Sequence, residues 1–555
     1  MQIKQINPEF AVSEQIHISD IQRLKQAGFQ SIICNRPDAE ESDQIAFAEI
    51  EREAERQGIS CAFLPVISGK VSQESAIEFA KLLTNLPQPC LAYCRSGTRS
   101  ITLWALSQAA NLPFSTLLNT AKQAGYDLSG IAHHLLNAGQ MSASKAEHSH
   151  AVVIVGAGAA GIAVASSLKS RAPDLDIAII DPADVHYYQP GWTMVGGGIF
   201  ESKDTVRTTA SVMPAGIKWI KAAATTFIPT DNLVLLDEYR QVKYEQLIVC
   251  PGVKLDWGSI AGLTDTLGKN GVTSNYRFDL APYTWELVKS LKSGKAIFTQ
   301  PPMPIKCAGA PQKAMYLSGD YWLNQGSLNN IDIEFFNAGK VLFGVKEYVP
   351  ELLKYVEKYQ ANLNFSLQLV AINGERKIAQ FKDLENESSP LVEKEFDMIH
   401  VVPPQHAPEF IRNSPLVDEA GWVDVQQTTL QHKKYKNIYG LGDVINAPNA
   451  KTAAAARMQA PVVAANLLHE RGLYPHKATY NGYGSCPLTV EKGKIILAEF
   501  GYGGTLLSSF PSWLIQGTKP SRLAWLLKAK VLPQLYWNGM LKGREWMAKP
   551  ELERS

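Results

Sequence analysis

The sequence has almost no net charge and few cysteines. Its 54 Lys and Arg residues are balanced by 53 Asp and Glu residues, which leaves +1 at pH 7. Long-range electrostatics therefore give no reason to expect a nucleic acid partner. The seven cysteines are odd in number and irregular in spacing, and no basic-then-apolar segment precedes them. We therefore expect a cytoplasmic protein without a secreted disulfide framework and without a metal site.

Long apolar runs are also scarce. The longest uncharged stretch, residues 151–168, has a Gly-Ala-Gly-Ala-Ala-Gly centre. That composition predicts a strand, a tight turn and a helix, so we expect no transmembrane helix. The chain of 555 residues is too long for one ordinary domain, and its 45% hydrophobic content is typical of packed globular proteins. We expect two to four domains.

The order of the patterns predicts an α/β protein with four parts. Residues 1–140 alternate short apolar strands with helical stretches and predict an α/β domain of their own. Residues 141–149 are small and polar, as in a linker. Residues 150–505 restart a βαβ pattern that predicts two interleaved nucleotide-binding domains of the Rossmann type. The remaining residues, 506–555, differ in composition and form a C-terminal tail.

A glycine turn at the start of the third part predicts a dinucleotide site. The run Gly156-x-Gly158-x-x-Gly161 follows the apolar stretch Val152–Val155 and opens an alanine-rich helix. Such a turn lets the backbone approach a pyrophosphate at the helix N-terminus. Asp181 follows the next predicted strand, where a carboxylate accepts the ribose hydroxyl groups. An unrelated α/β domain can contain the same turn, so this motif alone is weak evidence.

Two further elements strengthen the dinucleotide prediction. Gly442-Asp443, after a strand-like segment, resembles the late Gly-Asp of flavoproteins with two dinucleotide domains, whose Asp caps the ribityl chain of FAD. Leu247–Gly252 resembles an intermediate element of the same class. The second nucleotide unit continues from its strand into the Cys307 segment, where a glycine-rich phosphate turn would otherwise stand. We therefore expect FAD and do not expect a nicotinamide cofactor.

The flavoprotein part resembles the sulfide:quinone oxidoreductases, in particular the branch that includes the mitochondrial enzyme. The matching blocks are residues 186–198, 305–313, 421–424, 442–455 and 483–488. The resemblance implies an FAD enzyme that transfers electrons from sulfide or a low-molecular-weight persulfide to quinone. It also implies a set of cofactor-binding residues: Gly156, Gly158, Ala159, Gly161, Asp181, Gln189, Gly442, Asp443 and Lys451.

The resemblance places Cys307 at the catalytic centre but leaves its partner open. In the family, sulfide opens a bridge between two cysteines, and the cysteine in the Cys307 position then attacks the flavin. The second cysteine follows the Gly-Asp, where this chain has Val444. A valine has no nucleophile, so a bridge between these two positions cannot form. Either Cys307 works with an external sulfane-sulfur compound, or Cys250 or Cys486 replaces the missing partner, or Cys307 is only a core residue.

The composition of the C-terminal tail predicts that the tail contacts a membrane surface. Four tryptophans and seven Lys or Arg residues lie between residues 510 and 549, against the single acid Glu545. Aromatic rings at the headgroup level and cations toward anionic lipid are typical of a peripheral anchor. The resemblance implies a tail that opens the quinone pocket to the bilayer. A helix that packs only on the protein's own surface is the alternative.

A second cysteine loop, from Cys94 to Arg99, lies in the first domain. It joins a strand-like and a helix-like segment, so consecutive N–H groups and a helix N-terminus face whatever Cys94 holds and favour its thiolate. Arg99 is expected to hold an anion in bidentate fashion. The segment resembles a phosphatase-like family, in which Asp38 would be the general acid. Tyrosine phosphatases, however, have five residues between Cys and Arg, whereas the four present here are typical of rhodaneses, which carry a persulfide.

Together these patterns predict a peripheral flavoenzyme on the inner face of the cell membrane, fused to a thiol domain that handles sulfane sulfur or phosphate. A homo-oligomer is compatible with the sequence. Two other functions remain open. One is a redox-regulated phosphatase controlled by the flavoprotein, and the other is a type II NADH:quinone dehydrogenase, which shares the two-domain plan.

Overall fold

The structure is a computed structural model that describes residues 1–41, 44–68, 71–128, 131–132, 135, 148–237, 240–386 and 388–553. The chain forms two compact units, one of residues 1–148 and 233–242 and the other of residues 149–232 and 243–555. Most of the predicted linker, residues 141–147, lies outside the described residues. Its last two residues, His148 and Ser149, begin a strand.

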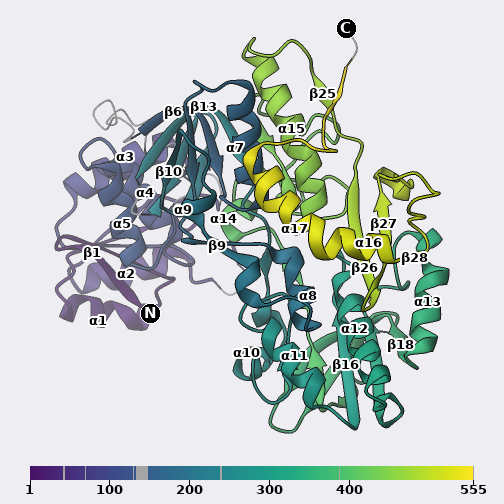
Figure 1. Cartoon of the computed structure of the whole chain (residues 1–555). Helices are drawn as coiled ribbons and strands as arrows, with labels where there is room; N and C mark the ends of the chain where they lie inside the picture. The colour runs from purple at the N-terminus through teal and green to yellow at the C-terminus, as the bar shows by residue number, and fades with distance from the viewer. Residues whose placement is uncertain are drawn as a thin grey trace. The chain divides into compact units, whose positions relative to one another are not determined.

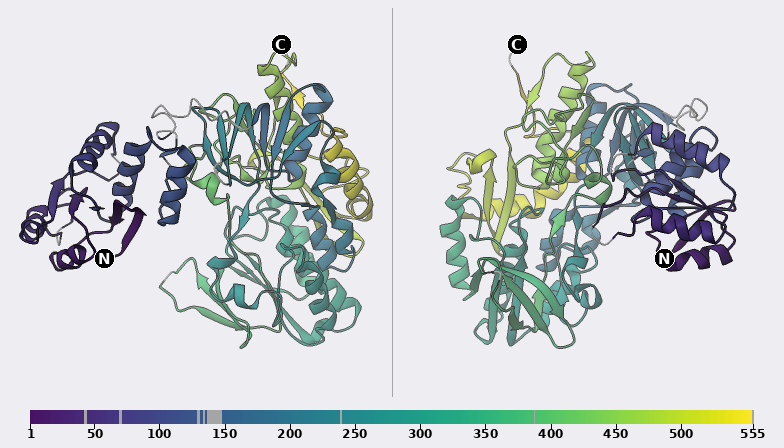
Figure 2. Two further views of the ribbon diagram at one scale, coloured as in Figure 1. Left: turned by 90° about the vertical axis from the view of Figure 1, so that its left-hand side faces the viewer. Right: turned by 180° about the vertical axis from the view of Figure 1, so that it is seen from behind.

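The first unit is built on a five-stranded sheet of the order β1-β2-β5-β3-β4, and its path can be followed in purple in Figure 2. Strand β5 is parallel to both neighbours, β2 and β3, and all four of its residues are buried. A run of apolar residues is what a strand covered on both faces requires. The elements are β1 Ile3–Asn7, β2 Phe10–Ser13, α1 Ile21–Gln26, β3 Ser31–Cys34, α2 Phe47–Arg56, β4 Ser60–Phe63, α3 Gln73–Asn85, β5 Cys90–Tyr93, α4 Thr98–Gln108 and α5 Phe114–Gln123.

The second unit contains two parallel sheets, as predicted. In the first, strands β10-β7-β6-β13 lie side by side and β24 pairs with β13. Helices α7 and α15 contact each other along their length, and Figure 1 shows them next to this sheet. The elements are β6 His148–Val155, α7 Ala159–Arg171, β7 Ile177–Ile180, β8 Val185–Tyr187, α8 Trp192–Gly196, β9 Val206–Thr208, α9 Thr209–Val212, β10 Ile217–Ile220, β11 Ala224–Ile228, β12 Leu233–Leu236, β13 Gln241–Val249, β24 Ile438–Gly440 and α15 Ala453–Glu470.

The second sheet has the order β15-β22-β16-β17-β18 and is parallel throughout. A three-stranded antiparallel sheet, β19-β20-β21, lies in the chain between β18 and β22 of this sheet. The elements are β14 Lys254–Leu255, α10 Leu263–Thr266, β15 Val272–Thr273, α11 Ala281–Ser290, β16 Gly294–Gln300, α12 Ala310–Asn324, β17 Ile331–Asn337, α13 Val349–Lys358, β18 Asn362–Phe365, β19 Leu367–Asn373, β20 Ile378–Asp383, β21 Val392–Glu395, β22 Met398–His400, β23 Gln405–His406 and α14 Glu409–Arg412.

The C-terminal part adds a β-hairpin and an irregular helical stretch to the second unit. Strands β26 and β27 pair antiparallel, and β26 contacts α12. The chain from Arg522 to Lys542 is then helical, with π-helical turns at Leu527–Val531 and Leu535–Gly539. The elements are β25 Ala478–Thr479, β26 Gly484–Glu491, β27 Lys494–Phe500, β28 Pro520–Ser521, α16 Arg522–Leu526, α17 Leu532–Gln534 and β29 Glu551–Leu552.

Candidate functional site

The glycine turn between β6 and α7 has the shape that a pyrophosphate requires. Gly156 has a φ of 111°, and a Cβ there would lie 2.6 Å from the carbonyl oxygen of Cys250. A Cβ at Gly161 would lie 1.8 Å from the carbonyl oxygen of Gly156, so only glycine lets helix and turn pack this closely. At Gly158, by contrast, a Cβ would meet nothing within 4 Å. This open side, at the start of α7 beside Ala159, fits a dinucleotide phosphate.

Asp181 lies beside the same turn. Its Oδ2 accepts a hydrogen bond from the Ala157 N–H at 2.6 Å, and its Oδ1 accepts one from the Ala183 N–H at 2.8 Å. These bonds fix the carboxylate next to the first residues of the glycine turn. Each oxygen keeps a lone pair for a further donor, so the position fits the ribose contact that the sequence predicts.

The late Gly-Asp is held by a buried lysine. The Gly442 N–H donates to Gln459 Oε1 at 2.7 Å, and Gly442 has a φ of 78°. Lys451 Nζ donates to the carbonyl oxygens of Asp443 and Ile445, at 2.7 and 2.8 Å. Burial raises the pKa of Asp443 and lowers the pKa of Lys451 to about 8. The Lys451 carbonyl accepts the Cys307 N–H at 2.8 Å, which joins the predicted cofactor residues to the cysteine loop.

Cys307 stands in a constrained loop between β16 and α12. Its φ of 51° lies in the left-handed region, where residues other than glycine are uncommon and where strain is a mark of functional sites. Next to it, Lys306 Nζ donates to Gln189 Oε1 at 2.5 Å, and burial lowers the pKa of Lys306 to about 8. The predicted residue Gln189 is thus brought to the Cys307 loop.

A second thiol lies beside Cys307. The Sγ of Cys486, on strand β26, is 3.8 Å from the Sγ of Cys307. Lys313, the fourth residue of α12, places its Nζ 3.2 Å from Cys307 Sγ and 3.9 Å from Cys486 Sγ. Of the alternatives that the sequence leaves open, the structure places Cys486 beside Cys307 as a partner inside the chain. Cys250, the other candidate, lies behind the glycine turn.

The two thiols differ in acidity. The hydrogen bond from Cys486, together with the ammonium groups of Lys313 and Lys528, holds the pKa of Cys307 well below its usual range. The same bond and burial raise the pKa of Cys486. These opposite shifts favour Cys307 as the thiolate and Cys486 as the hydrogen-bond donor. Burial and the charge of Lys313 lower the pKa of Lys528 to about 7.

The sequence interpretation did not assign Lys313 or Lys528 a role. Lys313 lies within the Cys307 block, so its spacing on α12 could have revealed it. Lys528 comes from the C-terminal tail, and its side chain is only 4% exposed. Nothing in the local sequence distinguishes it from the other tail lysines.

The tail also packs against the cofactor half of the unit. His186 on β8 contacts Tyr536 Oη at 2.6 Å with its Nε2, and its Nδ1 is 3.0 Å from the carbonyl oxygen of Ala157. Glu545 accepts hydrogen bonds from Ser167 and Arg171 on α7. Glu545, the single acid between residues 510 and 549, thus anchors the tail to α7. No helix in the described parts of the chain combines the length and apolar composition needed to cross a bilayer.

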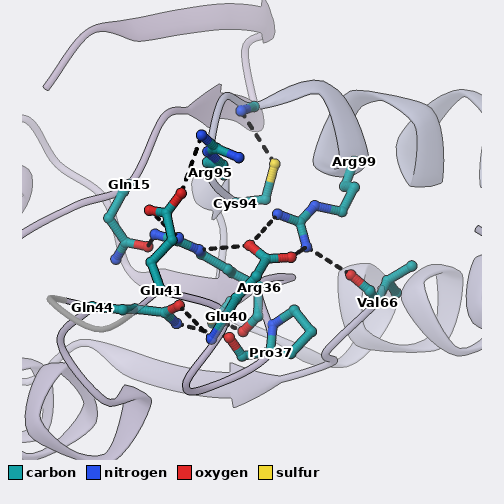
Figure 3. Close-up of polar contacts among 12 residues, drawn as sticks. Gln15, Arg36, Pro37, Glu40, Glu41, Gln44, Val66, Cys94, Arg95 and Arg99 are labelled. Atoms are coloured by element: carbon teal, nitrogen blue, oxygen red, sulfur yellow. Dashed lines mark hydrogen bonds and ion pairs between the residues drawn. The ribbon is translucent and has the colours of Figure 1, made fainter. Parts of the chain in front are cut away.

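The cysteine loop of the first unit follows the central strand β5. The Gly97 N–H donates to Cys94 Sγ at 3.2 Å, and Gly97 has a φ of 86°. Arg99 lies in the first turn of α4. Its Nη1 and Nη2 each lie 2.9 Å from an oxygen of Glu40, and Nη1 donates to the Val66 carbonyl at 2.8 Å (Figure 3). The guanidinium that the sequence predicts as an anion clamp is thus already paired with a carboxylate.

Two glutamates hold three arginines around this loop. Arg36 donates to Glu40 at 2.8 Å and to Glu41 at 2.7 Å, and Arg95 forms an ion pair with Glu41 at 3.1 Å (Figure 3). The hydrogen bonds from Arg99 and Arg36 lower the pKa of Glu40. Glu40 lies in the stretch that carries the phosphatase-like resemblance, yet the sequence alone assigned it no role.

The side chain of Asp38, the predicted general acid, contacts the start of a helix. Its Oδ1 accepts the Phe47 N–H at 2.8 Å, at the start of α2. The N-cap residue of α2 is Ala46, whose side chain forms no capping bond, so the more distant Asp38 satisfies a helix N–H that has no partner within the helix. The structure therefore gives Asp38 a helix-capping contact. The described residues show no hydrogen bond between Asp38 and Cys94.

Known proteins resemble the two units separately. Residues 2–111 match the family "Beta-lactamase hydrolase-like protein, phosphatase-like domain", and residues 150–304 match "Pyridine nucleotide-disulphide oxidoreductase". The mitochondrial sulfide:quinone oxidoreductase of Dictyostelium discoideum is 44% identical, and that of Mus musculus 38%. Each alignment covers 72% of this chain and 88% of the relative. The beta-lactamase hydrolase-like protein of Agrobacterium fabrum is 30% identical over 23% of this chain and 30% of its own length.

A solved structure has the fold of the second unit. The sulfide:quinone oxidoreductase from Aquifex aeolicus superposes with a TM-score of 0.61 and covers 73% of this chain and 98% of its own, at 18% identity. The predicted α/β plan, with a phosphatase-like domain before two Rossmann-like units, is confirmed. The order of the two parts along the chain is the one that the sequence predicts.

Proposed function

Because the chain belongs to the sulfide:quinone oxidoreductase family, whose members are FAD enzymes, we propose that it oxidises sulfide at Cys307 and Cys486 and passes the electrons to quinone. Bound FAD supplies an acceptor for two electrons and returns them to the quinone. The residues around the glycine turn, Asp181, Gly442 and Lys451 would hold it. The single observation that carries the proposal is the separation of 3.8 Å between the two sulfurs beside the Lys313 ammonium group.

The cysteine pair carries the sulfur chemistry in three balanced steps. Hydrosulfide attacks the Cys486 sulfur of a Cys307–Cys486 disulfide, so that a new S–S bond forms on Cys486 and Cys307 leaves as a thiolate. An acceptor thiolate then removes the outer sulfur and leaves Cys486 as a thiolate. Re-forming the S–S bond from the two thiolates then releases two electrons, for which bound FAD would be the acceptor. Lys313 stabilises the leaving thiolate in the first step, because its ammonium group is 3.2 Å from Cys307 Sγ.

Sulfide-dependent bleaching of the flavin under anaerobic conditions tests this function. The holoenzyme should lose its flavin absorbance on addition of sulfide and recover it on addition of a short-chain quinone. NADH alone should leave the absorbance unchanged, since the second nucleotide unit leads into the Cys307 loop. Bleaching by NADH and not by sulfide would instead indicate the type II NADH:quinone dehydrogenase, which the relatives do not favour.

We also propose that the tail attaches the protein to the inner face of the cell membrane. Nine of the 20 exposed large apolar side chains among the described residues lie between Leu506 and Leu552, including Trp513, which is 82% exposed. Lys519, Lys530 and other cations lie among them. Exposed aromatic and aliphatic groups next to cations are what a peripheral contact with anionic lipid requires.

Deletion of the tail would not test membrane binding cleanly, because Lys528 and Tyr536 are part of the core of the unit. Single substitutions of exposed residues are better suited. Trp513→Asp and Leu526→Asp should reduce flotation with vesicles that contain phosphatidylglycerol, while flavin content stays unchanged. Leu353→Asp, at an exposed apolar position on α13, is the matched control. Equal flotation of all three variants would rule out the tail as the contact.

For the first unit we propose sulfane-sulfur transfer through a persulfide on Cys94. The loop has four residues between Cys94 and Arg99, and Glu40 already occupies the Arg99 guanidinium. A phosphatase would use that guanidinium to bind a phosphoryl dianion in bidentate fashion. Thiocyanate formation from a sulfur donor and cyanide, measured beside hydrolysis of p-nitrophenyl phosphate, separates the two activities. Phosphate release that depends on Cys94 and on the redox state of the flavin would favour the regulated phosphatase.

A further inference from the structure

A large cavity adjoins the Cys94 loop inside the first unit. Its volume is about 1270 Å³, and it extends between α3 and α4. The loop contributes Arg95, Ser96 and Arg99 to its wall. Pockets for drug-sized molecules have volumes of about 300–1,000 Å³. The cavity therefore has room for an organic molecule, whereas phosphate or thiosulfate would fill only a small part of it.

The walls are suited to a polar, flexible molecule. Ala80 on α3 and Thr102 and Ser107 on α4 are small side chains that leave the space between the helices open. Lys81 and Arg95 bring positive charge, and their side chains are 61% and 67% exposed. Both form ion pairs with glutamates, at 2.7 and 3.1 Å. Exposed pairs of this kind contribute only about 0–1 kcal/mol, so both cations can exchange their partner for a ligand carboxylate.

Among the described residues that line the cavity, Glu74 is the one acid, and Lys81, Arg95 and Arg99 are the cations. Each cation is paired with a glutamate that is not among these lining residues, so its charge becomes available to a ligand when that pair opens. Arg99 is less available than the other two, because Glu40 and the Val66 carbonyl take three of its N–H groups. An anionic group of the ligand would therefore be bound by the exposed side chains of Lys81 and Arg95, away from the sulfur of Cys94.

The position of Cys94 limits what can be transferred. Its side chain is fully buried below the loop, with the Sγ bonded to the Gly97 N–H. A single sulfur atom needs less space there than a phosphoryl group with three oxygens. Arg95 and Ser96 line the cavity, whereas Cys94 is not among its described lining residues, so the sulfur lies behind the wall of the wider space that would hold the rest of the donor.

We propose that this cavity binds a low-molecular-weight organic persulfide whose carrier bears carboxylates, and that the carrier hands its outer sulfur to Cys94. This inference rests on the proposed sulfur transfer at Cys94 and names its donor. The Cys94 thiolate attacks the outer sulfur of R–S–SH. A bond between Cys94 and that sulfur forms, the S–S bond to the carrier breaks, and the carrier leaves as R–S⁻. No net oxidation occurs, and a second thiolate or cyanide removes the sulfur by the same displacement.

The transfer also gives the first unit a place in a reaction sequence. Sulfide oxidation in the second unit ends when an acceptor thiolate carries away a sulfane sulfur. The product of that step is an organic persulfide, which is the class of donor that the cavity would accept. The first unit would consume what the second produces, and free diffusion of the carrier is sufficient for this.

Two donors with one acceptor test the proposal on the full-length holoenzyme. Glutathione persulfide is the organic probe, thiosulfate the inorganic one, and cyanide the acceptor. Ala80→Trp should fill the cavity and raise the KM for glutathione persulfide by about tenfold, the effect of losing about 1.4 kcal/mol of binding. Turnover of thiosulfate should stay within about twofold, since the loop itself is unchanged. Arg52→Trp, at an exposed position on α2 outside the cavity, is the control.

A second variant guards against a folding defect. Lys81→Glu reverses a charge on an exposed side chain and should raise the KM for glutathione persulfide without changing thiosulfate turnover. If both variants leave the KM for glutathione persulfide unchanged, or lower the two activities equally with an unchanged melting temperature, the cavity is not the donor site. If Cys94→Ser removes neither activity, the proposed sulfur transfer at Cys94 itself fails.

Discussion

Tyr536 of the tail meets His186 of strand β8 at 2.6 Å, and the other nitrogen of the same ring lies 3.0 Å from the carbonyl oxygen of Ala157 in the glycine turn. One imidazole thus connects the C-terminal tail to the backbone that cradles the cofactor. Burial lowers the pKa of His186, so the ring is neutral at pH 7 and donates through one nitrogen only. The tail is therefore part of the cofactor site as well as a candidate membrane contact.

Tyr536→Phe should loosen FAD. The change removes the hydroxyl partner of a buried imidazole nitrogen, at a cost of about 1–3 kcal/mol. We expect a lower melting temperature and faster release of FAD on dilution, measured by flavin fluorescence. Tyr502→Phe is the control, because it removes a tyrosine hydrogen bond to Gln427, far from the glycine turn in sequence. Equal FAD release from both variants would contradict the link through His186.

Lys313→Met should move the titration of Cys307 to higher pH. The ammonium group stabilises the thiolate form, so its removal raises the low pKa of this thiol. At pH 7 the thiolate population, and with it the rate of alkylation of Cys307 by iodoacetamide, should fall. The rate should recover as the pH is raised. Lys346→Met, at an exposed position, should leave the profile unchanged, and an unshifted profile for Lys313→Met would refute the role of the lysine.

The ionisation of Lys528 should make the rate of flavin reduction depend on pH near neutrality. Its pKa is lowered to about 7, so below that value its charge supports the Cys307 thiolate and above it the charge is lost. Lys528→Arg keeps the charge at every working pH, whereas Lys528→Met removes it. We expect the rate of sulfide-driven flavin reduction, measured by stopped flow from pH 6 to 9, to change near pH 7 in the wild type and in neither variant. A change of rate near pH 7 that persists in both variants would arise from another group.

Glu40→Gln should weaken the Cys94 loop. In the folded protein the hydrogen bond from Arg99 lowers the pKa of Glu40 below its ordinary value. The carboxylate therefore contributes stability above its ordinary pKa, and this contribution is lost as the pH falls through the folded value. The hydrogen-exchange protection factors of residues 90–105 should fall at pH 7 in the variant, and in the wild type they should fall as the pH drops below the ordinary pKa of a glutamate. Glu78→Gln, in an exposed ion pair, should not change the exchange.

The sequence predicted the contacts between residues that are close in the chain, but it did not establish those between residues that are far apart in the chain. The glycine turn and Asp181 follow from a spacing of some 25 residues that any such β-strand, turn and helix imposes. Cys486 lies 179 residues beyond Cys307 and Lys528 lies 42 further, and only the packing of β26 and the tail on α12 brings them together. Asp38 was assigned as a general acid on resemblance alone, and its hydrogen bond to the Phe47 N–H could not be predicted from its place in the sequence.

The pairing of Cys307 with Cys486 is tested most directly by sulfide-driven flavin reduction in four variants of the holoenzyme. Cys486→Ser should fall to the level of Cys307→Ser, Cys61→Ser should match the wild type, and Val444→Cys should show no gain. Reduction at the wild-type rate in Cys486→Ser, or a gain in Val444→Cys, would contradict the account.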